Sequence, residues 1–553
     1  MIVKRSRAAV DFTGAGAGAG AGVRAVAVVV PGVVMLAIGL WGIDRGGMWR
    51  DEAVTFQVAR RSLPQIWHLL RSVDAVHGLY YLAMHPVLAV HSGEVALRLP
   101  SLCAAAVTAS LVAALGVRLA RPRVGLWAGL LYAVTPMVGH FAQEGRSYAW
   151  VAVGVAASTV LLVRAAGAGR TVPRASDGAR WWSYGGVTGV TVLLHEFAVL
   201  VLLAHALTLA LARMPRRVWW AWGRAAGGVL LVLLPLALVS SGQAGQVAWL
   251  RAPGGEAVEG LLRSFTGSTP LVLGPYLLLI VLALVPRRTP PARGGELSLP
   301  AVALPLLLVP PATLLAVSRH WPLFDDRYVL YALAGAPLLA AAGAERVAGA
   351  AARLCGRPAR WCHPYAVTGL GVCGVALAFV AQLPVLRADR DPARRPDNLA
   401  AVSAAAAERT GPGDPVLFLP ALARRAAVAY PKGFRGTADI ALRETGPVSG
   451  TLYGRESGPG ELRRRLDGLD RVWVIAEPYA LRPGWYPPDP AEQVKLALLR
   501  AEFAPRAESV RKGSVIRLYV RRSAAAGSGS GAGAGAVTRS PGSPGVPPRP
   551  ARP

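Results

Sequence analysis

The sequence has little charge for its length. Charged residues make up 16% of the 553 residues, whereas hydrophobic residues make up 53% and the mean hydropathy is +0.40. This composition excludes an ordinary soluble protein, and the length leaves room for several structural units. We therefore interpret the chain as a polytopic α-helical membrane protein.

Cysteine is also scarce. The four cysteines lie within or beside apolar runs, without the regular spacing of a disulfide framework, so we interpret them as small core-filling thiols. They are Cys103, Cys355, Cys362 and Cys373. Two of them lie near His363 in a basic loop, but this scattered group falls far short of the spacing that zinc sites show. We predict no metal and no cofactor.

Acidic residues are few, at 31 Asp and Glu against 60 Lys and Arg, which gives a net charge of +29. An excess of basic residues is typical of nucleic-acid binding when the residues cluster on one face. Here the arginines fall in short tracts between apolar runs, as they do in cytoplasmic loops under the positive-inside rule. We therefore expect the lipid bilayer as a partner and no nucleic acid.

We also expect no cleavable signal peptide, because the first apolar run, 23–40, is long enough to stay in the bilayer. Basic residues precede this run, so the N-terminus is predicted to be cytoplasmic and the first outer loop, 44–95, extracytoplasmic. Residues 14–22 are a low-complexity Gly-Ala run, and residues 1–22 are predicted to be disordered.

Basic loops and apolar runs alternate through the rest of the first 386 residues. The run 77–90 has only about 14 residues, fewer than the roughly 20 that a crossing helix needs, so we predict an interfacial helix there. The polar stretches 143–148 and 195–197 lie midway between basic loops and are predicted to be the outer turns of two helical hairpins. The count is eleven transmembrane helices within 23–386. They cover 23–43, 95–117, two within 124–163, two within 181–211, 218–240, 270–285, 297–317, one that returns to Arg346, and 364–386.

After Arg387 the composition becomes that of a soluble domain. Short apolar runs at 415–419, 471–476 and 514–520 predict strands, and 398–408 and 492–502 predict helices. We predict a small extracytoplasmic α/β domain over 387–522, followed by a disordered tail at 523–553 that is rich in Gly, Ser and Pro.

The polar outliers of the membrane part all fall on the predicted outer face. Ionisable groups at membrane depth are costly and are retained where they face a cavity or one another, so we expect one shared outer pocket. Carboxylates and arginines there suit a reaction in which a base takes a proton from a hydroxyl while cations stabilise a phosphate leaving group. The residues include Asp51, Glu52, Asp74, His77, Arg98, Glu144, Arg146, Tyr148, His195, Glu196, Arg327 and Tyr328.

Five short motifs occur in order along this part of the chain. They are Trp49-Arg50-Asp51-Glu52-Ala53, Asp74-Ala75-Val76-His77-Gly78-Leu79-Tyr80-Tyr81, Ala96-Leu97-Arg98-Leu99-Pro100-Ser101, Gln143-Glu144-Gly145-Arg146-Ser147-Tyr148 and Phe324-Asp325-Asp326-Arg327-Tyr328. Together they resemble the signature of the GT-C membrane glycosyltransferases. The chain is most similar to the protein O-mannosyltransferase-like group, family 39, and the aminoarabinose-transferase-like group of actinobacteria. The resemblance covers about residues 23–345.

This resemblance implies transfer of a sugar, mannose or another hexose or pentose, from a polyprenyl-phosphate-linked donor with inversion. It also implies an acceptor outside the cytoplasm, which would be a glycan, lipid or protein, and a multi-pass enzyme of the cell membrane. Asp51 would be the general base, and Glu52 would orient substrate or assist. The resemblance assigns the donor phosphate to Arg146, Tyr148, Arg327 and Tyr328, and substrate contacts to Asp74, His77, Tyr80, Arg98 and His195.

One motif departs from the family pattern, because Gly78-Leu79 follows His77 where family members usually have two prolines. This departure puts an acceptor contact of His77 in question. Simpler roles also exist for the other residues. Asp51 and Glu52 suit the N-terminus of a helix, and Arg327 and Tyr328 suit an interfacial anchor. His195 suits a hairpin turn, and Arg98 suits an ion pair with Glu94, four residues earlier.

Two other functions are compatible with a polytopic protein of this kind. A transporter or flippase of a lipid-linked saccharide would have charged or broken helices near the bilayer midplane and often internal repeats. The sequence shows neither, because its polar groups cluster towards one face. A non-catalytic sensor with a glycan-binding outer domain would leave Asp51 dispensable.

Overall fold

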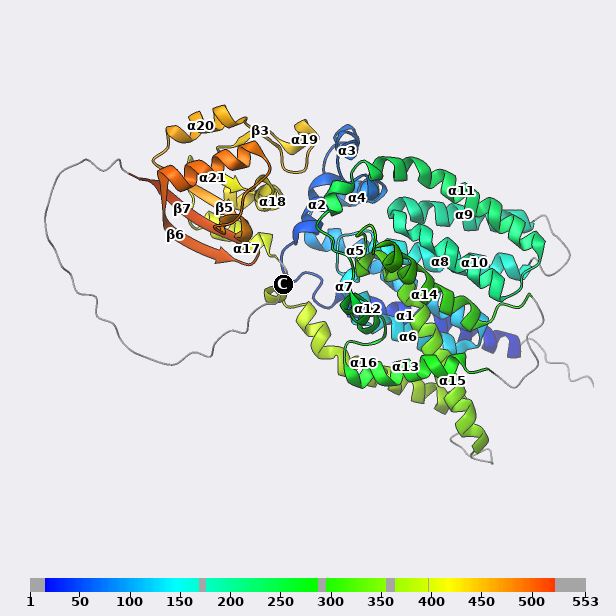
Figure 1. Ribbon diagram of the computed structural model, residues 1–553. Helices are drawn as coiled ribbons and strands as arrows, with labels where there is room; N and C mark the ends of the chain where they lie inside the picture. Colours follow the sequence, from blue (N-terminus) through cyan, green and yellow to red (C-terminus); the bar gives the residue numbers. More distant parts are fainter. Residues whose placement is uncertain (1–14, 169–175, 287–294, 355–363, 396, 523–553) are drawn as a thin grey trace, which may run out of the picture.

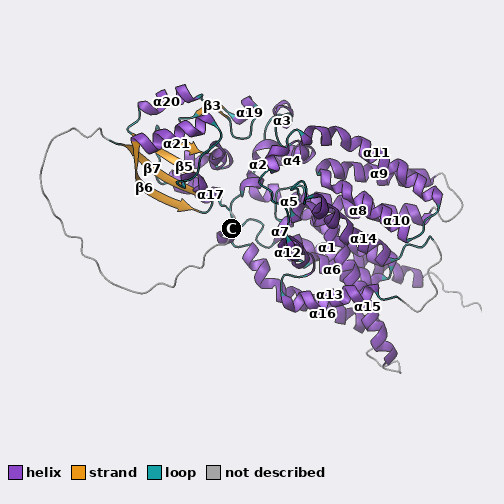
Figure 2. Cartoon of the chain, viewed as in Figure 1, coloured by secondary structure: helices purple, strands orange, loops and turns teal. Residues whose placement is uncertain are grey.

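The computed structural model describes residues 15–168, 176–286, 295–354, 364–395 and 397–522. A large helical part is followed by a compact α/β domain that packs against one end of the helices (Figure 1). Within the described residues, strands occur in the α/β domain alone (Figure 2). The structure thus confirms a helical fold with a small C-terminal sheet.

The long helices of the first part follow the apolar runs. They are α1 (Ala15–Leu40), α5 (Glu94–Leu119), α6 (Pro122–Ala133), α7 (Pro136–Ala142), α8 (Tyr148–Ala168), α9 (Ser176–Leu194), α10 (Val201–Leu211), α11 (Arg216–Ser241), α12 (Gly255–Thr266), α13 (Pro270–Leu284), α14 (Leu299–Val317), α15 (Gly335–Leu354) and α16 (Pro364–Asp389). Three 3₁₀ segments, η2 (Glu196–Leu200), η3 (Ala244–Val247) and η4 (Asp326–Ala334), lie between them.

The predicted count of eleven crossing helices is not confirmed. Among the described residues, seven helices are long and apolar enough to cross a membrane, or nine if each of two bent helix pairs is one span. The pair α6 and α7 bends by 65° before Pro136, because a proline disfavours helical backbone in the residue that precedes it. The pair α12 and α13 bends by 84° at Gly267, where φ is +156°.

Some other expectations differ from the structure. Residues 15–22 belong to α1, although their composition predicted disorder. Helix α12 lies between the predicted spans 218–240 and 270–285, where we expected a loop. Cys103 and Cys373 are exposed on the helical part, whereas core positions were predicted. Residues 1–14, the tail 523–553 and the group Cys355, Cys362 and His363 lie outside the described residues.

Helix α5 is at the centre of the helical part, where it packs against α1, α6 and α8. Its crossing with α6 is close, because a Cβ atom added at Gly116 would lie 2.6 Å from the Cα atom of Gly125. Fully buried tyrosines, including Tyr80, Tyr81 and Tyr132, extend the apolar core towards the first loop. The start of α5 is therefore packed against the first loop by this core.

The loop between α1 and α5 is largely helical. It contains α2 (Arg50–Ala59), α3 (Leu63–Leu70), η1 (Ala75–His77) and α4 (Gly78–Val90). The apolar run at 77–90 is therefore a helix, and it is shorter than the candidate spans, as predicted.

The C-terminal domain has a five-stranded sheet in the order β2-β1-β5-β7-β6. Strand β1 runs parallel to β2 and β5, and β7 runs antiparallel to β5 and β6. The strands are β1 (Pro415–Leu419), β2 (Ala438–Asp439), β5 (Arg471–Ala476), β6 (Phe503–Arg511) and β7 (Ser514–Arg521), and β3 (Leu442–Glu444) pairs with β4 (Arg455–Glu456). Its helices include α17 (Leu399–Ala407), α18 (Arg425–Ala429), α19 (Gly446–Ser449), α20 (Pro459–Asp467) and α21 (Pro490–Glu502).

This domain is fastened to the first loop by polar contacts. The Arg61 guanidinium, just after α2, donates to the carbonyl oxygens of Gly446, Thr451 and Leu452 at 2.9–3.3 Å. The Tyr430 hydroxyl accepts a hydrogen bond from the Met48 amide at 2.6 Å. The α/β domain and the Asp51-Glu52 pair therefore lie on the same side of the molecule.

Candidate active site

Asp51 and Glu52 lie in the first turn of α2 and face different surroundings. Consecutive residues of a helix are about 100° apart around its axis, because a turn has 3.6 residues. The Asp51 side chain is 23% exposed and lines one cavity, whereas the Glu52 side chain is 1% exposed at the wall of another. We call these the Asp51 cavity and the Glu52 cavity.

The Asp51 cavity has a volume of about 200 Å³ and is formed by the first loop, the turn before α8, the turn before η2, and the segments around η3 and η4. Its lining residues are Asp51, Asp74, Val76, His77, Arg146, Tyr148, His195, Glu196, Phe197, Gln246, Trp249, Leu250, Leu323, Arg327 and Tyr328. Residues nearly 280 positions apart in the chain thus share one cavity.

Arg327 is the central cation of this cavity. Its Nη1 donates to Asp51 Oδ2 at 3.0 Å, and its Nε lies 3.4 Å from Asp325 Oδ1. The guanidinium carbon lies 5.7 Å and 5.5 Å from the ring centroids of Tyr148 and Tyr328, within the range of cation–π attraction. These contacts hold the guanidinium plane in one orientation beside the Asp51 carboxylate.

Arg146 supplies a second cation, and it is almost fully buried. Its Nη2 lies 2.6 Å from His77 Nε2. Burial and the neighbouring Arg146 hold the pKa of His77 well below its usual value, so the ring is neutral and its Nε2 accepts the hydrogen bond. Asp74 accepts a hydrogen bond from Tyr81, and burial raises the pKa of this carboxyl.

His195 lies between His77 and Tyr328 in the lining of the Asp51 cavity. Its ring lies 4.9 Å from that of Tyr328 and 5.8 Å from that of His77. Burial, with Arg146 and Arg327 nearby, lowers the pKa of His195 to about 3, so this ring is also neutral. Its Nδ1 is buried and has no hydrogen-bond partner among the described residues.

The charges of the Asp51 cavity therefore suit an anion next to a base. Two guanidiniums face it beside the carboxylates of Asp51 and Glu196, the histidines add no positive charge, and the pKa of Asp74 is raised by burial. Arginine pairs readily with phosphate, because its fork of N–H groups matches the phosphate oxygens. Phe197, Trp249, Leu250 and Leu323 add an apolar wall.

Glu52 has different partners. Arg98 binds both of its carboxylate oxygens, at 2.7 Å and 2.8 Å, and the Gly145 amide donates to Oε1 at 3.2 Å. Arg395 Nη1 lies 3.6 Å from Oε2. The Glu52 carboxylate is thus engaged by the protein itself and acts as a brace between α2, α5 and the turn before α8.

Arg98 is fully buried and lines neither cavity. Its remaining N–H groups donate to the carbonyl oxygens of Ile43 and Gly47 at 2.9 Å and 3.3 Å. The local alternative of an ion pair with Glu94 is wrong, because Glu94 accepts from the Tyr430 hydroxyl at 2.6 Å. The contacts that the structure shows for Arg98 are internal, and its substrate contact stays a prediction.

The N-terminus of α2 is completed from a distant part of the chain. The N-cap residue Trp49 has an indole, which has no acceptor for a free backbone N–H. Asp397, in the linker to the α/β domain, accepts from the Arg50 amide at 3.0 Å and from Arg50 Nε at 2.8 Å. Because the Asp397 side chain is only 1% exposed, this cap fixes the helix turn that carries Asp51.

The structure brings most of the predicted site residues together. Eight of them line the Asp51 cavity, and these are Asp51, Asp74, His77, Arg146, Tyr148, His195, Arg327 and Tyr328. Glu52 lies at the other cavity, and Arg98 is internal. Tyr80 is fully buried, and its ring packs edge-on against Trp150 with 5.6 Å between centroids.

Several lining residues were missing from the prediction. Gln246, Trp249 and Leu250 come from the stretch after α11, which carried no motif, although a tryptophan in a polar loop is a usable signal. Phe197 is the last residue of the predicted turn at 195–197 and was within reach of sequence reasoning. As for metals, among the described residues there is no group of three or more His, Cys, Asp or Glu side chains that would hold an ion.

The helical part, with paired carboxylates in its first loop and an α/β domain above them, has the GT-C type of fold. Two solved structures with this fold are those of ArnT from Cupriavidus metallidurans. The apo structure matches with a TM-score of 0.55 and the structure bound to undecaprenyl phosphate with 0.50; each has 13% identity and covers 89% of this chain and 97% of that chain. No protein-family model matches the sequence, and a search of curated proteins gave no match. At this identity the likeness shows a shared fold, so the activity has to be argued from the site.

Proposed function

We propose that the protein is a membrane glycosyltransferase that transfers a sugar from a polyprenyl-phosphate-linked donor to an extracytoplasmic acceptor. The observation that carries this proposal is the ion pair between Asp51 and Arg327, at 3.0 Å inside one cavity that also contains the buried Arg146. A carboxylate and two guanidiniums in one partly enclosed space match a proton transfer coupled to departure of a phosphate.

In the proposed reaction the Asp51 carboxylate takes the proton of the acceptor hydroxyl. The hydroxyl oxygen attacks the anomeric carbon from the face opposite the phosphate, and a new C–O bond forms with inversion. The bond between the anomeric carbon and the phosphate oxygen breaks, and its electron pair leaves with the polyprenyl phosphate. Arg327 and Arg146 stabilise the charge of this leaving group.

The aromatic groups of the cavity support this assignment. Tyr148 and Tyr328 flank Arg327, so their rings limit the guanidinium to orientations that face the cavity. Phe197 and Leu323 provide apolar surface for the first isoprene units beside the phosphate. One of the two ArnT structures is bound to undecaprenyl phosphate, a ligand of the same chemical class.

We place the Asp51 cavity and the α/β domain on the extracytoplasmic side of a cell membrane, with the N-terminus in the cytoplasm. The support is the alternation of basic loops with apolar helices. The acceptor is a glycan, lipid or protein, and the donor sugar is mannose or another hexose or pentose.

The test is reconstitution of the purified protein in liposomes with a set of radiolabelled polyprenyl-phosphate sugars and a cell-envelope extract as acceptor. The wild type is compared with Asp51→Asn. The matched control is Asp44→Asn, because Asp44 is an exposed aspartate of the same loop and lines neither cavity.

We expect labelled product with the wild type and with Asp44→Asn, and its loss with Asp51→Asn. Movement of unmodified donor lipid across the bilayer, without product, would support a flippase instead. Equal product formation by all three proteins would remove Asp51 from the role of base.

A further inference from the structure

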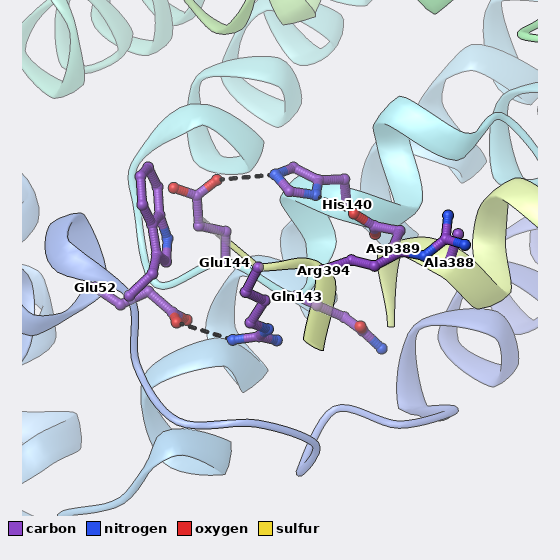
Figure 3. A pocket seen from close by; sticks show the side chains of 9 residues that line it. Glu52, His140, Gln143, Glu144, Ala388, Asp389 and Arg394 are labelled. Carbon is purple, nitrogen blue, oxygen red and sulfur yellow. Dashed lines mark hydrogen bonds and ion pairs between the residues drawn. The ribbon is translucent and has the colours of Figure 1, made fainter. Parts of the chain in front are cut away.

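The Glu52 cavity is lined from a different face of α2 than the Asp51 cavity and has a volume of about 160 Å³. A buried water needs only about 10–15 Å³, so the space is large enough for an organic ligand. Figure 3 shows its labelled side chains, which come from the start of α2, from α7 and the turn after it, and from the end of α16 and the linker beyond. Helices and linker therefore meet around it.

Glu144 is the most unusual residue of this cavity. It is 3% exposed, and both of its carboxylate oxygens lack a hydrogen-bond partner among the described residues. The closest cation is His140, whose Nε2 lies 3.9 Å from Glu144 Oε2, and Figure 3 shows the carboxylate directed towards it. A buried carboxylate costs free energy unless its oxygens are bonded, so this site is incomplete without a ligand that donates hydrogen bonds.

The other lining groups narrow the kind of ligand. His140 Nδ1 is bonded to Asp389 at 2.6 Å, which leaves its Nε2 facing the cavity. Arg394 and Arg395 also line the space, together with the carboxylates of Glu52, Glu144 and Asp389, so the lining offers both donors and acceptors. Carboxylate acceptors, guanidinium donors and the indole of Trp49 together suit a neutral ligand with many hydroxyls and an apolar ring face, which is a sugar.

Two short segments connect this cavity to the Asp51 cavity. Asp51 and Glu52 face one cavity each, and so do Arg146 and Glu144, which flank Gly145. The Gly145 amide donates to Glu52 Oε1 at 3.2 Å and joins the two segments. Glu144 is therefore two positions along the chain from Arg146, one of the proposed donor contacts.

We propose that the Glu52 cavity binds a sugar ring of a glycan acceptor, with Glu144 accepting hydrogen bonds from its hydroxyls. This inference rests on the proposed function, and it narrows the acceptor from a glycan, lipid or protein to a saccharide. Arg394 and Arg395 donate to ring or hydroxyl oxygens, and Trp49 packs on the ring face. Glu52 itself remains a brace, because its oxygens are engaged by Arg98.

The kinetic test compares Glu144→Gln with the wild type, using the radiolabelled donor and an oligosaccharide fraction of the envelope extract. Loss of a charged hydrogen-bond acceptor is expected to raise the KM for the oligosaccharide about tenfold or more. The KM for the donor lipid is expected to stay within about twofold. Glu259→Gln is the matched control, because Glu259 is an exposed glutamate of α12 that pairs with Arg263 on the same helix.

A second variant covers the case in which Glu144→Gln folds poorly. Arg394 is exposed, with 69% of its side chain accessible, so Arg394→Gln leaves the interior intact. It is expected to raise the KM for the oligosaccharide by a smaller factor. A rise in the donor KM alone, in either folded variant, would overturn the inference and assign the cavity to the donor.

A binding measurement separates failure of this inference from failure of the proposed function. Saturation-transfer NMR with neutral methyl hexosides and pentosides needs no turnover. Signals with the wild type and Glu259→Gln that vanish with Glu144→Gln support the sugar site even where no donor is turned over. Equal signals from all three proteins, or signals from none of them, would overturn it.

Discussion

The two sides of α2 differ in how completely the protein uses its own charges. On one side, Asp51 pairs with Arg327 at the wall of a cavity that also contains Arg146 and a set of aromatic rings. On the other side, Glu52 has both oxygens bound by Arg98 and is nearly inaccessible. Two adjacent acidic residues thus differ in structure, because the Asp51 carboxylate borders a cavity whereas the Glu52 carboxylate joins helices.

This difference predicts that substitution of Asp51 affects activity and that substitution of Glu52 affects stability. The effect on activity is expected to be the largest. Asp51→Asn removes the proposed base, and general-base catalysis typically contributes about 10²–10⁴-fold to rate. We expect transfer to fall by that factor, while the apparent Tm in detergent stays close to that of the wild type. An Asp51→Asn variant with normal activity, or one that no longer folds, would contradict the predicted difference in role between Asp51 and Glu52.

Glu52→Gln is expected to act on stability instead. It leaves the fully buried Arg98 without its counterion, and breaking a buried pair in this way costs about 3–5 kcal/mol. The apparent Tm measured by nanoscale fluorimetry should fall markedly, with low yield of folded protein. The double variant Glu52→Gln with Arg98→Met should recover part of the loss, and no recovery would speak against the pair as the cause.

Arg327→Lys sharpens the description of the Asp51 cavity. Lysine keeps the charge but lacks the planar fork that meets Asp51 and packs against Tyr148 and Tyr328. We expect the KM for the donor lipid to rise about tenfold, as for the loss of one strong charged contact. Arg263→Lys on the exposed face of α12 provides the control, and an unchanged donor KM in Arg327→Lys would remove this residue from phosphate binding.

Asp397→Asn tests whether the distant cap positions Asp51. The substitution weakens the bonds to the Arg50 amide and side chain, and loss of a helix cap costs about 1 kcal/mol. We expect kcat to fall severalfold with little change in either KM, together with a small drop in apparent Tm. Asp391→Asn, at an exposed cap in the same linker, is the control. A change in KM alone would contradict a positioning role.

The smallest expected effect is on the apparent Tm of Glu144→Gln, and it depends on the pH. Burial raises the pKa of Glu144 to about 7, and His140 offsets this only in part. Between about pH 4.5 and 7 the folded protein keeps a proton that the unfolded chain releases, so this group makes the fold less stable as the pH rises. The apparent Tm of Glu144→Gln relative to the wild type should therefore increase across this window. A difference that does not vary with pH would contradict the raised pKa.

Much of the helical part could be predicted, because a membrane-crossing helix needs a local run of apolar residues and basic loops flank such runs. Apolar runs and arginine tracts indicated α5, α11 and α14 almost to the residue, and the turn before α8 fell where the hairpin logic put it. The count of spans was harder, because α10 and α13 are short and a bend at Pro136 or Gly267 cannot be told from a loop by composition. Helix α12 is amphipathic, with Leu261 and Phe265 buried, but the charged residues of this stretch led us to expect a loop.

The site residues likewise fall into those that local sequence could place and those whose contacts depend on tertiary packing. Asp51 and Arg327 could be assigned to one face by parity, but pairing over 46 positions between Glu52 and Arg98 depends on tertiary packing. The local rule for helix neighbours favoured Glu94, which in fact bonds to Tyr430 from the α/β domain. Asp397 carried no motif at all, and its role at Arg50 becomes visible only when the domain is docked.

The cap at Arg50 has a consequence for the order of biosynthesis. The loop between α1 and α5 leaves the ribosome early, yet Asp397 and Tyr430 are translated more than 330 residues after the loop groups that they bind. A nascent chain that has inserted all of its helices still lacks the partners that settle the start of α2. Translation that stops before residue 397 is therefore expected to give a chain whose α2 lacks the cap that Asp397 supplies at Arg50.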